Sequence, residues 1–228
     1  MSAQTDHDRW PLALFLLFWA ATCFDPPYPR ELVLQHIPTT AALALLVRLQ
    51  GRRVLSRTNG RLVLAFLALH ALGARYLYSY VPYDDWVTAV FGRSLSSICG
   101  FTRNHYDRAV HFAYGVLLFF PVREVLVRRF GQAGFSGDLL AIQFILATSA
   151  LYELVEWAVA LAFAPDWAEH YNGQQGDMWD AQKDMALASL GGLAAMIGRV
   201  LFSAGVLRRP FLRPDLGGDI AFPAVESI

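Results

Sequence analysis

The chain has 228 residues, of which 55% are hydrophobic and 17% are charged, and its mean hydropathy is +0.35. Soluble domains are typically about 45–50% apolar and about 25% charged, so this composition favours a membrane protein over a soluble one. Nineteen Lys and Arg residues balance 19 Asp and Glu residues, and a net charge of zero argues against a nucleic-acid partner.

Six segments are apolar enough to predict membrane-spanning helices, which need about 20 such residues at about 1.5 Å each. In chain order they cover residues 10–24, 31–49, 62–81, 106–127, 139–163 and 177–202. The flank before Trp10 is mixed in sign and Ala20 to Cys23 match a lipoprotein signal poorly, so the first segment is predicted to be retained. The sequence predicts an all-α, polytopic transmembrane helix bundle over residues 1–205 and a loosely ordered cytoplasmic tail over 206–228.

The basic residues predict the orientation of the bundle, because short cytoplasmic loops are rich in Lys and Arg. They crowd the loops after the second and fourth segments and the C-terminal tail, at Arg48, Arg52, Arg53, Arg57, Arg61, Arg128, Arg129, Arg208, Arg209 and Arg213. The alternate loops carry acids, among them Asp84, Asp85, Asp166 and Glu169, with fewer basic residues. Both chain ends are therefore predicted to lie in the cytoplasm, N-in and C-in.

The long loop between the third and fourth segments carries apolar residues at helical spacing from Trp86 to Ile98. This pattern predicts either an amphipathic helix lying flat on the outer surface or a short helix that caps the bundle. Cys23 and Cys99 both fall near the predicted outer face. A disulfide between them can form in an oxidising compartment, but we expect two free thiols.

Ionisable residues gather in the last three segments, where a charge at the helix centre costs about 2.5–3.5 kcal/mol and usually serves a function. They form three stripes, which are Asp107, His111 and Tyr114, then Glu153 and Glu156, then Asp177, Asp180 and Asp184. Spacings of three and four residues put each stripe on one helix face. The predicted topology brings all three stripes to a similar depth in the outer half of the membrane. His70 and Arg75 of the third segment are placed to border the polar site that results.

Such a cluster cannot stay fully ionised in a dry cavity, so its acids must be protonated, paired with basic groups or bound to a cation. Carboxylates with an imidazole suit Mg²⁺, Mn²⁺, Ca²⁺ or Zn²⁺, which makes a divalent cation the candidate cofactor. Under this hypothesis His111 is a general base that Asp107 orients. The candidate cation ligands are Glu153, Glu156, Asp180 and Asp184. The candidate substrate-binding residues are Arg103, Arg108, Tyr114 and Asp177.

Three functions remain open for this cluster. The leading hypothesis is a metal-assisted hydrolase or transferase that acts on envelope lipids. A proton-coupled transporter would use the same carboxylates as relays, but it needs polar groups that continue to the cytoplasmic side, where these helices are apolar. In a structural or accessory protein, Arg103, Arg108 and Lys183 would neutralise the acids in an ion network.

Three motifs surround these acids. They are Arg103-Asn104-His105-Tyr106-Asp107-Arg108 with His111-Phe112, Tyr152-Glu153-x-x-Glu156-Trp157, and Gln175-Gly176-Asp177-x-Trp179-Asp180-x-Gln182-x-Asp184-Met185. Together they resemble the YjdF-like inner-membrane family, bacterial membrane proteins without an assigned activity, over residues 10–205. The resemblance implies a multi-pass protein of the bacterial inner membrane and gives no reaction. The run Asp107-Arg108-Ala109-Val110-His111-Phe112 is also similar to an Asp-(Lys/Arg)-x-x-His-Phe pattern of the VanZ-like family, which by analogy implies a link to envelope lipids.

Overall fold

The computed structural model describes residues 10–163 and 174–203 of the chain. Its helices are α1 (Trp10–Thr22), α2 (Pro29–Gly51), α3 (Arg57–Arg75), α4 (Tyr83–Phe91), α5 (Leu95–Cys99), α6 (Tyr106–Phe130), α7 (Gly134–Phe163) and α9 (Asp180–Ser203). No strand occurs within these described ranges, so the predicted all-α fold class is confirmed. The predicted tail over 206–228 and the loop acids Asp166 and Glu169 lie outside the described residues.

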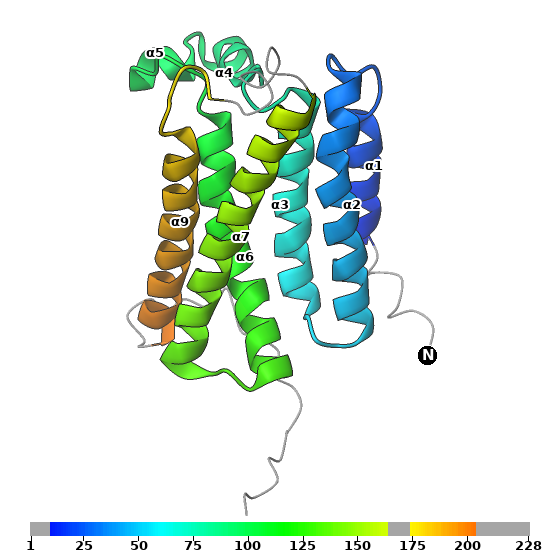
Figure 1. Ribbon diagram of the computed structural model, residues 1–228, viewed down its shortest axis with the longest axis vertical. Coiled ribbons are helices and arrows are strands. Elements are labelled where there is room, and N and C mark those ends of the chain that lie inside the picture. Colours follow the sequence, from blue (N-terminus) through cyan, green and yellow to red (C-terminus); the bar gives the residue numbers. More distant parts are fainter. Residues whose placement is uncertain (1–9, 164–173, 204–228) are drawn as a thin grey trace, which may run out of the picture.

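The long helices run side by side along the long axis of the molecule, and α4 and α5 lie across one end (Figure 1). Helices α2, α6, α7 and α9 are long and apolar enough to cross a membrane, and α1 is a shorter apolar helix of 13 residues. The remaining long helix, α3, carries arginines at both ends and packs against α1, α2 and α6. A helix enclosed by its neighbours needs less apolar surface than one that faces lipid. The number of spans and the orientation stay predictions.

The segment from Trp86 to Ile98, predicted as an amphipathic helix on the outer surface or a short helix that caps the bundle, forms two short helices that bury no residue. Gly92 ends α4 in a left-handed conformation with φ of 74°, which glycine adopts without steric cost. The side chain of Ser94 then begins α5 by accepting a hydrogen bond from the Ser97 N–H. Asp84 of α4 accepts a hydrogen bond of 2.9 Å from the Ser96 N–H, and its hydrogen bonding to Ser96 lowers the pKa of Asp84.

The opposite end of the bundle is held by Glu124 of α6. Its Oε2 accepts hydrogen bonds from the N–H of Ser56 at 2.9 Å, the Ser56 hydroxyl at 2.8 Å and Nδ2 of Asn59 at 2.7 Å. Arg128 pairs with Oε1 of the same carboxylate at 2.9 Å. These contacts dock the turn between α2 and α3 onto the C-terminal part of α6. The arginine-rich loops after α2 and α6 therefore lie at the same end of the bundle, as the predicted orientation requires.

Helices α6 and α9 approach each other backbone to backbone, and glycines permit it. A Cβ added to Gly115 of α6 would lie 1.9 Å from the carbonyl oxygen of Ala188 in α9. A Cβ added to Gly191 of α9 would lie 2.2 Å from the carbonyl oxygen of Phe112 in α6. Small residues allow such close packing between helices in membranes. The approach fixes the first turns of α6 opposite the first turns of α9, where the predicted acidic stripes begin.

Candidate functional site

Asp107, His111, Glu153 and Asp184 come together between α6, α7 and α9, and we refer to them as the acid group. Nε2 of His111 lies 3.6 Å from Oδ1 of Asp107 and 3.4 Å from Oε1 of Glu153. One ligand atom from each of Asp107, His111 and Asp184 lies within 4.8 Å of the other two. Three carboxylates and one imidazole therefore face a common centre.

Helix geometry explains how the acid group is built. Asp107 and His111 are one turn apart on α6, so their side chains point to the same side. The backbone contact at Gly115 and Gly191 brings that side of α6 against α9, where Asp184 lies about two turns before Gly191. Helix α7 packs against both helices and supplies Glu153. The group is largely enclosed, since Asp184 is 2% exposed and His111 is 8% exposed.

Two carboxylate oxygens of the acid group have no hydrogen-bond partner in the described part of the chain. Oε1 of Glu153 and Oδ1 of Asp184 are buried and accept no hydrogen bond there. Nδ1 of His111 has a long contact of 3.5 Å with the hydroxyl of Ser149. Buried polar atoms are nearly always satisfied, so orphaned carboxylate oxygens indicate a ligand such as a cation or water. Two carboxylates and one imidazole within 4.8 Å fit the donor set that a divalent cation takes in proteins.

A second cluster lies at the N-terminal ends of α6 and α9, and we call it the ion-pair layer. It comprises Arg103, Arg108, Asp177, Asp180 and Lys183. Arg103 donates to both oxygens of Asp180, at 2.7 and 3.2 Å, and Arg108 donates to Oδ1 of Asp180 at 3.2 Å. Asp177 accepts hydrogen bonds from Lys183 at 2.6 Å and from Arg108. The hydrogen bonds from Lys183, the Trp179 N–H and Arg108 lower the pKa of Asp177 to about 2.

The two clusters differ in what they can do. In the ion-pair layer, arginines and a lysine neutralise Asp177 and Asp180. The hypothesis of a structural ion network predicts such pairing for every acid of the three stripes. Asp180 therefore lies apart from the three candidate ligands that approach within 4.8 Å. Asp177, predicted within the sixth helix, precedes α9, which begins at Asp180. Its carboxylate accepts a hydrogen bond from the Trp179 N–H at 3.1 Å and so shapes the turn into α9.

A cavity of about 160 Å³ adjoins the acid group on the side of α2 and α3. Its polar lining residues are Thr39, His70, Tyr78, Asp107, His111, Tyr114, Thr148, Ser149 and Tyr152. Tyr114, a predicted substrate-binding residue, lines this cavity and forms a hydrogen bond of 2.6 Å with Thr148. The cavity gives the acid group an adjacent space that polar groups surround on several sides.

Sequence reasoning did not identify the buried network that borders this cavity. Gln35 is 2% exposed, and its carbonyl oxygen lies 3.0 Å from Nε2 of His70. Tyr152 donates to Oε1 of Gln35 at 3.0 Å, and Tyr78 is hydrogen-bonded to Nδ1 of His70. Gln35 and Thr39 lie one turn apart in an apolar segment, which is the signal that could have revealed them. His70 borders the site as predicted.

Four other residues lie outside the acid group. Glu156 is one turn from Glu153, and neither glutamate is among the residues whose ligand atoms approach one another within 4.8 Å. Arg75, expected to border the site, instead donates to the backbone carbonyls that follow α1, those of Thr22, Phe24 and Asp25. Cys23 and Cys99 are exposed, free thiols, as expected.

Comparison with known proteins identifies the family. The family model described as "Predicted membrane protein (DUF2238)" matches residues 8–204. The inner membrane protein YjdF of Escherichia coli (strain K12) is 32% identical over 199 residues, covering 87% of this chain and 90% of that protein. No solved structure matches. The chain therefore belongs to the DUF2238 family of membrane proteins, and the YjdF-like resemblance and the inner-membrane location are confirmed. The VanZ-like similarity stays a prediction.

Proposed function

We propose that this member of the DUF2238 family holds a divalent cation with Asp107, His111 and Asp184 and acts on a phosphate or ester group of an envelope lipid. The observation that carries the proposal is the approach of one ligand atom from each residue to within 4.8 Å of the other two. The orphaned oxygens of Glu153 and Asp184 support it, because a bound cation would replace repulsion between acids with coordination. A cation at this place would polarise a phosphoryl or carbonyl oxygen and activate a water molecule.

The contacts favour a division of roles within the acid group. Nε2 of His111 lies between Asp107 and Glu153, so we assign this imidazole to the cation as a ligand. A nitrogen that donates its lone pair to a metal cannot also take up a proton, which moves the role of general base away from His111. The buried Oε1 of Glu153 has no hydrogen-bond partner in the described residues. We propose the carboxylate of Glu153 as the base that accepts a proton from water.

An apolar layer supports an enzyme over a proton-coupled transporter. Asp138 of α7, at the other end of the same helices, pairs with Arg123 of α6 and Arg199 of α9. Between this ion pair and the acid group lies a core cluster that includes Phe119, Ile145 and Ala188, each 0% exposed. A proton relay needs polar groups that continue across the membrane, whereas a catalytic pocket needs one closed end.

Cation-dependent thermal stability tests the first half of the proposal. The full chain, purified in detergent, is unfolded by heat with and without Mg²⁺, Mn²⁺, Ca²⁺ or Zn²⁺. A cation at about 100 times its Kd stabilises the folded state by about 2.7 kcal/mol, which corresponds to a Tm rise of about 5–10 °C for a chain of this size. Asp184→Asn should abolish the rise, and the surface control Asp85→Asn should keep it. If none of the four cations raises the Tm, the cation site does not exist.

Lipid turnover tests the second half. The protein is reconstituted in vesicles of phosphatidylethanolamine and phosphatidylglycerol with the cation that gives the largest Tm rise, and products are identified by mass spectrometry. The parent should convert a lipid and Asp184→Asn should not. A cation-dependent Tm without any lipid product would retain the cation site and reject the enzyme in favour of an accessory role.

A further inference from the structure

A groove between α6 and α9 lies on the opposite side of α6 from the acid group. The groove has a volume of about 790 Å³, within the range of about 300–1,000 Å³ typical of ligand sites. At the start of α6, His105, Ala109 and Phe112 line the groove, and helical spacing places them on a different face from Asp107 and His111. It is therefore separate from the candidate cation site, and an inference about it does not depend on the proposed function.

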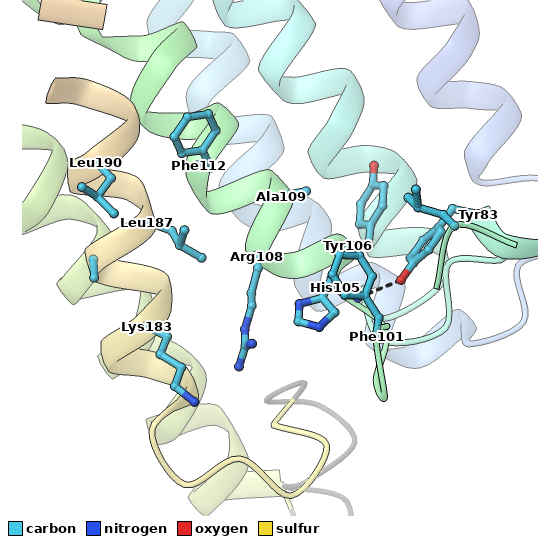
Figure 2. A pocket seen from close by; sticks show the side chains of 12 residues that line it. Tyr83, Phe101, His105, Tyr106, Arg108, Ala109, Phe112, Lys183, Leu187 and Leu190 are labelled. Carbon is cyan, nitrogen blue, oxygen red and sulfur yellow. Dashed lines mark hydrogen bonds between the residues drawn. The ribbon is translucent and has the colours of Figure 1, made fainter. Parts of the chain in front are cut away.

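The lining of the groove has an apolar body and a basic end. Leu187 and Leu190 of α9 and Phe112 of α6 line the apolar part, and Ala109 and Ala186 leave room between the two helices. Leu95 and Phe101 cover it from the segment that contains α5. Figure 2 shows the charged ends of Arg108 and Lys183 pointing toward the turn that precedes α9, while Phe112 and Leu190 lie at the far end.

The basic end is chemically suited to a phosphate. Among the residues that line the groove, Arg108 and Lys183 carry positive charge and none is a carboxylate. Lys183 is 49% exposed at its side chain, so its ammonium group can reach an incoming anion while it also contacts Asp177. The hydroxyl of Tyr83 accepts a hydrogen bond from the His105 N–H at 3.1 Å and keeps its own proton to donate (Figure 2). Arginine, lysine and hydroxyl groups are common donors to phosphate oxygens.

We infer that this groove binds one anionic phospholipid, with an acyl chain along Ala109, Ala186 and Leu190 and its phosphate at Arg108 and Lys183. The groove spans eight residues along each helix, from His105 to Phe112 and from Lys183 to Leu190, which is a rise of about 10 Å along the helix axis. This separation matches an amphiphile that keeps its charged group at the membrane surface and its chain in the apolar layer.

Native mass spectrometry of the full chain in neutral detergent tests this inference. The protein is titrated with phosphatidylglycerol and with a diacylglycerol that has the same acyl chains but no phosphate. One phosphatidylglycerol should be retained, and diacylglycerol should bind at least about tenfold more weakly, since charge-assisted hydrogen bonds contribute about 1.5–3 kcal/mol. Equal binding of the two lipids would refute the phosphate end of the groove.

Variants locate the lipid. Lys183→Gln should weaken phosphatidylglycerol binding about tenfold, and the charge-retaining Lys183→Arg should restore it. Ala186→Trp, which fills the groove from an exposed position on α9, should abolish binding. Ala194→Trp, at an exposed position of the same helix outside the groove, is the matched control and should bind normally. If Ala186→Trp leaves lipid binding intact, or instead converts a dimer to a monomer, the groove is not the lipid site.

Discussion

Two substitutions of the same type, Asp180→Asn and Asp184→Asn, should have opposite effects on stability. Each keeps the size of the side chain and removes one negative charge, and both carboxylates are 2% exposed. Asp180 is paired with Arg103 and Arg108 at 2.7 and 3.2 Å. Removing one carboxylate of a buried ion pair costs about 3–5 kcal/mol, because Asp177, which also pairs with Lys183, then has to neutralise both arginines. At about 2–4 °C per kcal/mol, the Tm of Asp180→Asn should fall by roughly 6–20 °C.

Asp184 has a different environment. Its Oδ1 accepts no hydrogen bond from the described residues, and the neighbouring acids Asp107 and Glu153 repel it. Removing a charge from a crowded acidic site commonly leaves the fold unharmed or stabilises it, so the Tm of Asp184→Asn without added cation should stay the same or rise. Differential scanning calorimetry of both variants in one detergent measures the contrast. If Asp184→Asn unfolds as early as Asp180→Asn, the acid group is a structural network and the reasoning about its orphaned oxygens is wrong.

Three further predictions concern packing, topology and pH. Gly115→Ala should separate α6 from α9, lower the Tm by several degrees and remove the cation response. Gly198→Ala, with nothing within 4 Å of its added Cβ, should have none of these effects. Calorimetry with and without cation measures both variants. A membrane-impermeant maleimide added to intact cells should label the exposed Cys99 of α5. The same reagent should fail to label a cysteine placed at position 57 by Arg57→Cys in a protein that lacks the two native cysteines. The reverse pattern would invert the topology. Hydrogen bonds lower the folded-state pKa of Asp177 to about 2 from its usual value of 3.8, so its stabilising contribution should be complete above about pH 4 and lost only as the pH falls toward 2. Asp177→Asn should remove this dependence from acid-unfolding curves.

The helices were largely predictable because long apolar runs have few alternatives in a chain of this composition. The ends of α3 were not, since the segment predicted over 62–81 forms a helix over Arg57–Arg75 in the structure. Ser56 caps the helix early, and Leu77 and Tyr78 end it with positive φ values of 50° and 56°. Such angles are costly for large side chains, and the hydrogen bond from Tyr78 to the buried His70 offsets part of that cost. A contact between residues eight positions apart decides this boundary, and local sequence patterns do not encode it.

The convergence of the acidic stripes could be expected from sequence, but the partner of each acid could not. Helical spacing places Asp107 beside His111, and the order of the helices places both near the first turns of α9. Arginine side chains are long and reach over several turns, so Arg108 could have neutralised Asp184 as easily as Asp180 from the sequence alone. The structure settles which acid this arginine pairs with, because Arg108 contacts Asp177 and Asp180 at the N-terminal end of α9.

The same three helices contain a comparison that bears on the meaning of the acid group. Near its N-terminal end, α7 buries Asp138, which is 0% exposed and receives an arginine from α6 and another from α9. This arrangement is what a carboxylate needs when its role is to hold helices together, because burial of an unpaired charge is costly. Toward the other end of α7, Oε1 of Glu153 lies 3.4 Å from Nε2 of His111 in α6, and Glu153 interacts electrostatically with Asp184 of α9. These neighbours are an imidazole and a carboxylate instead of two arginines. The chain neutralises Asp138 with two arginines but leaves Glu153 beside a histidine and a further acid, and this contrast supports the proposal that the acid group holds a ligand.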